Sequence, residues 1–288
     1  MAASLPALTF PSVRNVIPQP FHGPLRRLLV RALALLPLPK HVAFIMDGNR
    51  RKARQEGVEV IKGHEKGFEA LKTLLEFLLA LEIPNVTVYA FAIDNFNRPS
   101  EEVDGLLELA RVKLLELSDK GNILDHYGVR INVVGRKDLL PDNLQRAIEH
   151  TEQATMNNKR GTLNVCCAYS SRDELTHAVR SAVDKVDHGM LDRSDINAKT
   201  LEESLYTSPN ALHGWSLPDP DILVRTSGVS RLSDFLLWQV SEKTSLSFIP
   251  RLWPEIGVAD LLPVLLGWQA EETWRRLKVD YIKWEKVD

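Results

Sequence analysis

The stretch His41-Val-Ala-Phe-Ile-Met-Asp-Gly-Asn-Arg-Arg51 joins a short apolar strand to a polar turn that carries one carboxylate and two arginines. A helical pattern, with leucines three or four residues apart, covers 68–81, and a buried strand follows at 86–93. Strands separated by helices of this length predict an α/β fold, with a mostly parallel central sheet that helices flank on both faces. The alternation continues, with helices expected at 99–121, 143–156, 173–187 and 259–288, and strands at 129–134, 162–169 and 221–226.

The composition of the 288 residues is that of a globular protein, with 36 Lys and Arg against 38 Asp and Glu. A net charge of -2 argues against a surface that binds nucleic acid, because such domains usually carry a basic excess. Cys166 and Cys167 are adjacent in a predicted strand and point to opposite faces, so we expect no bond between them and a reducing compartment. No apolar stretch reaches the roughly 18 to 20 residues that span a bilayer, which argues against an integral membrane protein.

The N-terminal part differs from the rest in composition. The first 46 residues contain no Asp or Glu, and residues 1–24 carry five prolines. We therefore predict a disordered basic segment over 1–24 and a single catalytic domain over 39–288. Between them, leucines at helical spacing beside three arginines predict an amphipathic helix over 25–38. Such a helix is compatible with an anionic membrane surface, with packing on the domain or a partner, and with a transit peptide.

Arginines and small polar residues follow four of the predicted strands. The carboxyl ends of parallel strands share one edge of a sheet, where ligands bind, so we expect these runs to meet in space. Guanidinium groups with Gly, Asn and Ser near helix starts are typical of a site that binds a phosphate or diphosphate. Asp47 could hold Mg²⁺ between its carboxylate and the phosphate oxygens. An Asp-Gly-Asn triplet alone is usually a turn, and the interpretation depends on convergence. The runs are Asp47–Arg51, Asp94–Arg98, Ser170–Arg172 and the region around Thr226 with Arg225, Ser227, Gly228, Arg231 and Ser233.

Familiar nucleotide and hydrolase signatures are missing from the chain. It has no Gly-x-Gly-x-x-Gly, no phosphate-binding loop that ends in Gly-Lys-Ser/Thr, and no Gly-x-Ser-x-Gly. The histidines lie scattered, without the short spacing of a zinc site. We keep only His64, which follows Gly63 at a helix start, as a candidate site residue.

Four stretches together resemble the cis-prenyltransferases. They are His41–Arg51, Tyr89–Pro99, Leu163–Arg172 and Asp221–Gly228, the last followed by Arg231, Ser233 and Phe235-Leu-Leu-Trp-Gln239. They stand in the family's order at similar spacing over about 39–254, and they are most similar to the catalytic subunits of eukaryotic dehydrodolichyl diphosphate synthases. The resemblance implies the undecaprenyl diphosphate synthase fold, with an apolar tunnel walled by the helices at 68–81 and 103–117. Plain core packing would give the same leucine pattern.

The resemblance implies a role for each matching residue. Asp47 matches the catalytic aspartate that binds Mg²⁺ and assists departure of the allylic diphosphate. Asn95 matches an asparagine with a proton-handling role. The remaining matches imply binding of the two diphosphates, at the allylic site for Gly48, Asn49, Arg50, Arg51 and His64, in the second motif for Asp94, Phe96 and Arg98, and at the isopentenyl site for Arg225, Arg231 and Ser233.

The implied reaction condenses isopentenyl diphosphate with farnesyl diphosphate into a long polyprenyl diphosphate for dolichol and protein glycosylation. Ionising an allylic diphosphate builds negative charge on the leaving group, so Mg²⁺ and pre-placed arginines stabilise the transition state more than the substrate. The carbocation and the double bond then need positioning in a dry apolar pocket. The implied place is the cytoplasmic face of the endoplasmic reticulum membrane, by peripheral contact.

Several positions depart from the family pattern. Val60 stands where relatives have a phosphate-binding arginine, and Ala92, Asp94 and Arg136 replace a usual Ser, Glu and acid. Near Ser245, bacterial relatives have a metal-binding Glu that eukaryotic catalytic subunits often lack, which leaves Asp47 as the one expected metal ligand.

The C-terminal stretch Tyr281–Asp288 contains no Arg-x-Gly, the element that completes the isopentenyl site in single-chain members. The resemblance implies that a homologous, membrane-bound subunit supplies it. Two alternatives remain open. One is a non-catalytic subunit of such a complex that binds a lipid diphosphate, and the other is a nucleotide-binding α/β protein.

Overall fold

The computed structural model describes residues 24–119, 123–212, 214 and 217–285. The predicted disordered segment 1–24 lies outside them except for Pro24, where the first helix begins. Six strands form one sheet in the order β3-β4-β2-β1-β5-β6, and every neighbouring pair is parallel. The predicted α/β class with a mostly parallel sheet is confirmed. The strands are β1 (His41–Ile45), β2 (Asn85–Ala92), β3 (Val129–Val134), β4 (Gly161–Tyr169), β5 (Ile222–Arg225) and β6 (Ser245–Phe248).

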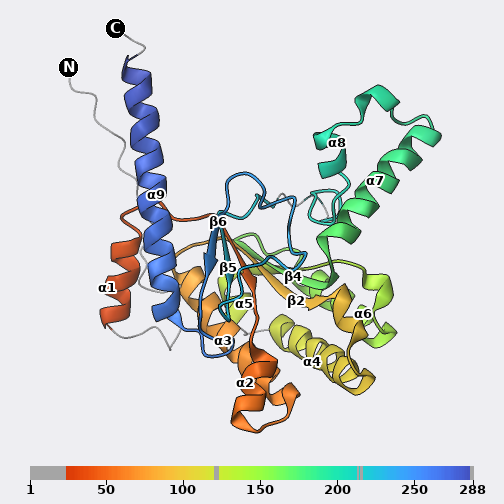
Figure 1. Cartoon of the computed structure of the whole chain (residues 1–288), viewed down its shortest axis with the longest axis horizontal. Coiled ribbons are helices and arrows are strands. Elements are labelled where there is room, and N and C mark those ends of the chain that lie inside the picture. The colour runs from red at the N-terminus through yellow and green to blue at the C-terminus, as the bar shows by residue number, and fades with distance from the viewer. Residues whose placement is uncertain (1–23, 120–122, 213, 215–216, 286–288) are drawn as a thin grey trace.

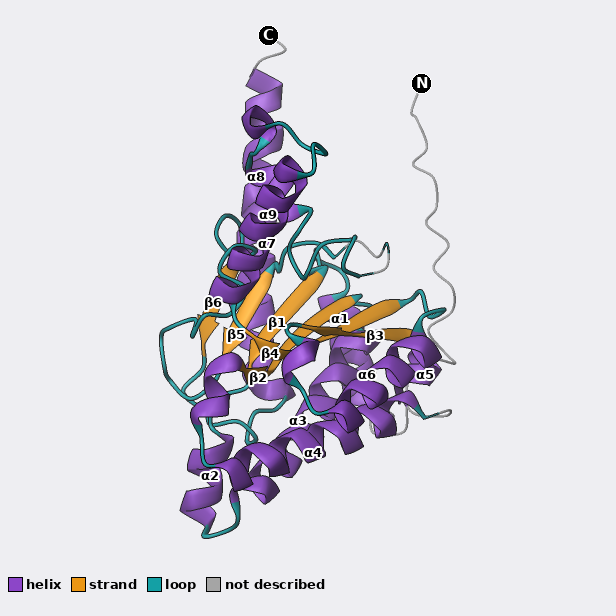
Figure 2. Cartoon of the chain, turned by 90° about the vertical axis from the view of Figure 1, so that its right-hand side faces the viewer, coloured by secondary structure: helices purple, strands orange, loops and turns teal. Residues whose placement is uncertain are grey.

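Helices pack on one face of this sheet around a large apolar core, and α3, α4 and α6 lie together on this side (Figure 2). The second face packs against 206–212 and 232–240, two segments that consist mostly of turns, through buried residues such as Leu212, Phe235 and Leu236. The helices are α1 (Pro24–Leu33), α2 (Asn49–Glu56), α3 (Val60–Ala80), α4 (Ser100–Ser118), α5 (Ile123–Tyr127), α6 (Asp142–Thr155), α7 (Ser171–Asp187), α8 (Ala198–Glu202) and α9 (Val258–Glu285), with 3-10 turns η3 (Ile93–Asn97), η4 (Lys137–Leu139) and η5 (Arg193–Asp195).

The two cysteines lie on opposite sides of the sheet, as their adjacency in a strand predicts. Cys166 belongs to the smaller core and Cys167 to the larger one, and both are free thiols. Burial raises the pKa of the Cys167 thiol to about 12, so this group stays protonated at neutral pH.

The helix α1 ends at Leu33, so the predicted helix over 25–38 is too long. Pro37 lacks an N–H and restricts the residue before it, and the chain turns at 34–36. Of the interpretations that the sequence left open, packing on the domain is what the structure shows for α1. Val30 and Leu33 are buried, and Gln269 of α9 donates to the carbonyls of Leu33 (2.8 Å) and Pro37 (3.0 Å). Figure 1 shows α1 lying beside α9.

The helix α3 begins at Val60, eight residues before the start that the leucine pattern predicts. Its first turns carry Gly63 and Gly67, which interrupt the apolar pattern because they serve close contact with α2. No helix in the described part of the chain combines the length and the apolar character needed to cross a membrane.

Candidate active site

The strands β1 and β5 are neighbours, and the chain leaves them in opposite directions, β1 toward β2 and β5 toward β6. A crevice outside the carboxyl ends of two such strands is where open parallel sheets bind ligands. Ile45 pairs with Arg225 at this edge, so the turn that follows β1 meets the last residue of β5. The topology therefore brings Asp47 and Arg225 together although 178 positions separate them.

The carboxylate of Asp47 is the centre of this edge. Its Oδ2 accepts hydrogen bonds from Arg225 Nη2 and Ser227 Oγ, both at 2.9 Å, and its Oδ1 lies 3.1 Å from a guanidinium nitrogen of Arg51. Partial burial opposes ionisation, but the bonds from Arg225, Ser227 and Arg51 outweigh it and hold the pKa of Asp47 below its usual value. Asp47 is thus an ionised carboxylate at neutral pH.

The backbone around Asp47 is fixed on both sides. Its N–H donates to Thr226 Oγ1 (3.0 Å), and its carbonyl accepts from Thr226 Oγ1 (2.6 Å) and from the N–H of Trp253 (3.0 Å). Gly48 has φ of 127°, and a Cβ there would lie 2.7 Å from the nitrogen of Trp253. Only glycine fits this turn, which explains the Asp-Gly pair.

The turn leads directly into α2, whose N-cap Gly48 offers no side-chain hydrogen bond. The amide groups of an uncapped first turn, with the helix dipole, can bind an anion. Asn49 is buried at this end. Its Oδ1 has no hydrogen-bond partner among the described residues, and a Cβ on Gly67 of α3 would lie 2.2 Å from it. The glycines of α3 therefore make room for the Asn49 amide.

A second group of cations lies beside Asp47. Arg50 Nε and Arg98 Nη1 approach the same oxygen of Glu102, at 3.2 and 3.1 Å. Burial and the charge of Arg50 lower the pKa of Arg98. The charges of Glu102 and Asp47 raise it, so Arg98 lies close enough to Asp47 to interact with its charge. The turn after β1, the loop after β2 and the start of α4 therefore meet at Glu102.

His64 completes this group from the first turns of α3. Burial lowers its pKa to about 4, helped by the charges of Arg98 and Arg50. The imidazole is therefore neutral at physiological pH, and its buried Nε2 has no partner among the described residues. A neutral ring with an open nitrogen can donate a hydrogen bond to a phosphate oxygen.

The second motif lies on η3, directly after β2. Asn95 Oδ1 accepts from the N–H of Ala92 (3.2 Å), and Phe96 packs edge-on against Phe91 with ring centroids 4.9 Å apart. Asp94 is exposed, and its charge acts on Tyr89 and Arg172. No contact with Asp47 or Glu102 is observed for Asp94 among the described residues.

Arg225 joins the Asp47 cluster to a second segment of chain. Its side chain is almost fully buried, and its Nη1 donates to Ser233 Oγ (2.7 Å) and to the carbonyl of Arg231. The side chains of Arg231 and Ser233 are themselves exposed, next to this fork. The guanidinium of Arg225 thus contacts Asp47 through Nη2 and the 231–233 turn through Nη1.

Helical positions that the sequence suggested as tunnel walls belong to the core. Leu74, Leu75 and Leu78 of α3 and Leu107 and Leu114 of α4 are buried in one apolar cluster. The apolar tunnel remains a prediction. Half-buried Met46, Ile61, Phe68, Phe96 and Ala110 border the same cluster.

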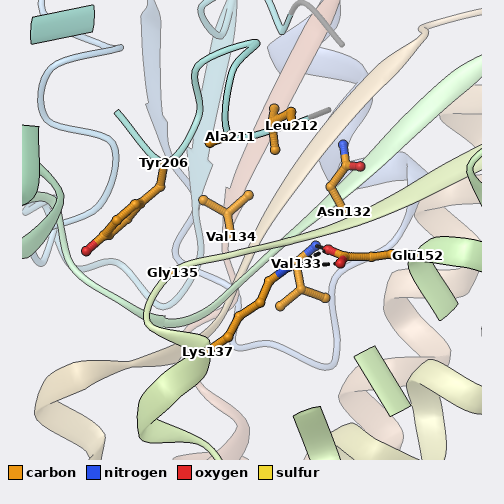
Figure 3. A pocket seen from close by; sticks show the side chains of 9 residues that line it. All are labelled: Asn132, Val133, Val134, Gly135, Lys137, Glu152, Tyr206, Ala211 and Leu212. Atoms are coloured by element: carbon orange, nitrogen blue, oxygen red, sulfur yellow. Dashed lines mark hydrogen bonds and ion pairs between the residues drawn. The ribbon is translucent and has the colours of Figure 1, made fainter. Parts of the chain in front are cut away.

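A cavity of about 90 Å³ lies apart from this site, at the carboxyl end of β3 (Figure 3). It has room for about three water molecules. Its cation, Lys137, is paired with both oxygens of Glu152 at 2.8 Å. Arg136, one of the departures noted above, is paired nearby with Asp138 (2.6 Å) and Asp173 (3.4 Å). These charges are neutralised within the fold.

Comparison with known proteins places this chemistry in a family. Residues 45–276 match the family model described as "Putative undecaprenyl diphosphate synthase". A dehydrodolichyl diphosphate synthase complex subunit of Homo sapiens is 48% identical over 233 residues, which cover 81% of this chain and 68% of that protein. A subunit of the same description from Schizosaccharomyces pombe is 40% identical over 248 residues, 86% of this chain and 91% of that protein. The chain belongs to the cis-prenyltransferase family.

The solved structures agree with this assignment. Lavandulyl diphosphate synthase from Lavandula x intermedia, in complex with dimethylallyl diphosphate, superposes with a TM-score of 0.73 at 35% identity, covering 81% of this chain and 95% of that one. A probable undecaprenyl diphosphate synthase from Campylobacter jejuni superposes with a TM-score of 0.64 at 25% identity, over 81% and 96% of the two chains. This cis-prenyltransferase chain is an enzyme that transfers prenyl groups.

Three contacts of this site are not predicted from the sequence, although Ser227 belongs to the predicted run around Thr226. Ser227 donates to Asp47, Glu102 bridges two arginines, and Trp253 donates its N–H to the Asp47 carbonyl and its indole Nε1–H to the Gly67 carbonyl (2.9 Å). Glu102 stands in the acidic first turn of a helix, where a carboxylate is expected for the helix dipole alone. The sequence places Ser227 in the right run without a partner, and Trp253 lies too far along the chain from Asp47 and Gly67 for its contacts to be predicted.

The residues of this cis-prenyltransferase site fit Mg²⁺ with Asp47 as its single protein ligand. No group of three or more His, Cys, Asp or Glu gathers for a metal within the described ranges. Mg²⁺ often takes one or two carboxylates and completes its shell with substrate phosphates and water. Asp47 is ionised and half-buried beside the uncapped start of α2, which suits a single protein ligand.

Proposed function

We propose that this cis-prenyltransferase condenses isopentenyl diphosphate with farnesyl diphosphate, in a Mg²⁺-dependent reaction, to make a long-chain dehydrodolichyl diphosphate for dolichol and protein glycosylation. The observation that carries the proposal is the position of Asp47 between two sets of cations. Arg50, Arg51 and Arg98 lie on the α2 and α4 side, and Arg225 and the adjoining Arg231 lie on the β5 side. Two diphosphates need two such sets, and one carboxylate between them can serve a metal.

On the first side, the α2 amides and the side chains of Asn49, Arg50 and Arg51 would bind the allylic diphosphate, with His64 as a neutral donor. Mg²⁺, held by Asp47, would supply charge neutralisation for the departing diphosphate. The guanidinium groups stabilise the same developing charge, and they are already in place in the folded chain. Arg98 and Glu102 keep this cationic group in position.

On the second side, Arg225, Arg231 and Ser233 would hold the diphosphate of isopentenyl diphosphate. Phe96 borders the larger core and offers an apolar ring to the reacting carbons. The Oδ1 of Asn95 accepts from Ala92 N–H, and its Nδ2 group is a donor, so Asn95 would orient the diphosphate oxygen that takes up the proton lost from substrate. Growth of the chain into an apolar tunnel, which we propose between α3 and α4, would be favoured by about 0.8 kcal/mol per buried CH₂.

We also propose a partner and a place. Related proteins from Homo sapiens and Saccharomyces cerevisiae are named as complex subunits, which supports a homologous, membrane-bound subunit that supplies an Arg-x-Gly element. The exposed Arg27, Arg31, Leu28 and Leu35 of the α1 region support peripheral contact with a membrane, for which we propose the cytoplasmic face of the endoplasmic reticulum. Residues 39–288 would form one catalytic domain, behind the segment 1–24 and helix α1.

The test incubates the full chain with Mg²⁺, farnesyl diphosphate and labelled isopentenyl diphosphate, with and without a homologous subunit that ends in Arg-x-Gly. Labelled long-chain product that needs Mg²⁺ is the expected result, with full turnover only when the subunit is present. Full turnover by the chain alone would refute the partner. Binding of farnesyl diphosphate without turnover in either condition would instead identify a non-catalytic, lipid-diphosphate-binding subunit. Protection by ATP and none by farnesyl diphosphate in a thermal melt would point to a nucleotide-binding protein.

A further inference from the structure

The segment 231–237 has an unusual backbone for a substrate-binding turn. Ser233, Asp234 and Leu236 have φ of 49°, 61° and 48°, in the left-handed region that non-glycine residues rarely adopt. Such a conformation costs free energy and persists only where the surroundings determine it. The question is what holds this turn, since its Ser233 and Arg231 carbonyl are the groups that receive the Arg225 fork.

The start of α7 holds the turn through its backbone. The N–H groups of Ser171 and Arg172 donate to the carbonyl (2.8 Å) and to Oδ1 (3.1 Å) of Asp234. Leu237 N–H donates to Ser171 Oγ at 2.8 Å. Phe235, between them, is buried and stacks on Tyr89 with ring centroids 4.5 Å apart. These contacts with the start of α7 and with Tyr89 form a clamp on the turn, and they are separate from the contacts of Ser233 and the Arg231 carbonyl with Arg225.

One buried carboxylate organises this clamp. Glu174 is 0% exposed, and its two oxygens accept four hydrogen bonds. Oε1 accepts from Thr207 N–H (3.1 Å) and Oγ1 (3.2 Å), and Oε2 accepts from Tyr169 Oη (2.5 Å) and Gln239 Nε2 (3.0 Å). The donors come from the end of β4, from the loop after α8 and from the far end of the 231–239 segment. Four donors match the acceptor capacity of a carboxylate and leave no room for an amide.

We propose that Glu174 is the positioning residue for the second diphosphate of this enzyme, through its hold on the 231–237 turn. The path of contacts is continuous. Glu174 binds Tyr169 and Gln239, and Tyr169 Oη lies 3.3 Å from Ser171 Oγ, which accepts from Leu237. The turn then meets Arg225, and Arg225 meets Asp47. Glu174 touches neither substrate nor Asp47, so it acts only through the geometry of the turn.

The proposal deepens the proposed function and rests on it. The arrangement predicts a larger effect on isopentenyl diphosphate than on farnesyl diphosphate, because the clamp holds the 231–237 turn directly and reaches the allylic side only through Arg225 and Asp47. Loss of the clamp should therefore weaken isopentenyl diphosphate binding strongly and farnesyl diphosphate binding little. A carboxylate with a merely structural role would lower thermal stability without that split.

The experiment compares the full chain with Glu174→Gln, each together with the homologous subunit that ends in Arg-x-Gly. The substitution keeps the size of the side chain but replaces one acceptor by a donor that faces other donors. Gln239→Met is a milder variant that removes one donor. Glu149→Gln, on the exposed side of α6, is the matched control. KM for each diphosphate is measured in turnover, dissociation constants by calorimetric titration with isopentenyl diphosphate, and folding by thermal melt.

For Glu174→Gln we expect the KM and dissociation constant of isopentenyl diphosphate to rise by about tenfold or more, and the KM of farnesyl diphosphate to change by less than about twofold. Gln239→Met should shift the same constants in the same direction by a smaller factor, and it decides the matter if Glu174→Gln does not fold. Equal rises for both substrates, or a lower melting temperature with unchanged constants, would overturn the proposal. If the wild-type chain binds isopentenyl diphosphate but does not turn it over, the proposed function is refuted. The titration would still test the role of Glu174, because it compares dissociation constants and needs no turnover.

Discussion

Replacing Arg225 by lysine tests how much of the site depends on one guanidinium fork. The side chain is buried, and its two terminal nitrogens reach three acceptors on two segments. Lysine keeps the charge but offers a compact ammonium that cannot span Asp47 and the 231–233 turn together. Arg225→Lys should therefore lose at least one of the two connections.

The magnitude follows from the bonds that are lost. Hydrogen bonds to charged groups contribute about 1.5–3 kcal/mol each. Losing one or two of them from the side of the site that we propose for the second diphosphate should cost about 3 kcal/mol, which is roughly 100-fold in kcat/KM for isopentenyl diphosphate. The pKa of Asp47 should rise in the same variant, because Arg225 is a main cause of its lowering, and the acid limb of the pH-rate profile should move to higher pH.

Steady-state kinetics with isopentenyl diphosphate varied at saturating farnesyl diphosphate measures both effects. Arg54→Lys, on the exposed side of α2, is the matched control and should behave as wild type. Adding Ser233→Ala to Arg225→Lys should cost less than the sum of the single changes, since both remove the 2.7 Å contact. An Arg225→Lys enzyme within about threefold of wild type would refute the role given to the fork.

Two further predictions concern stability. Gly67→Ala places a Cβ 2.2 Å from Asn49 Oδ1, so we expect a loss of about 1–3 kcal/mol in chemical unfolding together with weaker allylic binding; an unchanged denaturation midpoint would contradict this close packing. His41 is fully buried, its Nδ1 bonded to Pro218 O and its Nε2 to Thr87 Oγ1, both at 2.7 Å, and burial lowers its pKa to about 4. The unfolded chain binds the proton more readily, so stability should fall as pH drops from about 6.5 to 4, by about 3 kcal/mol from this residue. His41→Gln should flatten that part of a pH series of denaturant unfolding curves, and an equally steep loss would show that other groups cause it.

The sequence indicates the fold where periodicity is strong and misses it where tertiary contacts decide. The apolar runs of β1, β2, β4 and β5 and the leucines of α4 predict their elements well. The helix α2 reads only as a turn, because Asn49–Glu56 has Ala53 as its one apolar residue. The edge strand β6 has four residues, and its Leu246 and Phe248 are exposed, so no buried pattern marks it.

The site divides in the same way. Convergence of the runs after β1, β2 and β5 follows from parallel topology alone, and the structure brings Asp47, Arg51 and Arg225 into contact. The run after β4 meets the others differently. Arg172 is largely exposed and pairs with Asp234 at 2.9 Å, behind the 231–237 turn. Glu102 and Glu174 cannot be identified as site residues from their spacing in the sequence. Their roles depend on contacts with distant residues that form only in the folded chain.

The central claim is that prenyl transfer requires one ionised carboxylate, Asp47, between two sets of arginines. The most direct test is to measure the incorporation of labelled isopentenyl diphosphate by Asp47→Asn. Asp184→Asn, on the exposed side of α7, is the matched control, and circular dichroism checks the fold. We predict that wild type and Asp184→Asn incorporate label equally and that Asp47→Asn loses at least about 100-fold in rate while it remains folded. Wild-type incorporation by a folded Asp47→Asn enzyme would contradict the account.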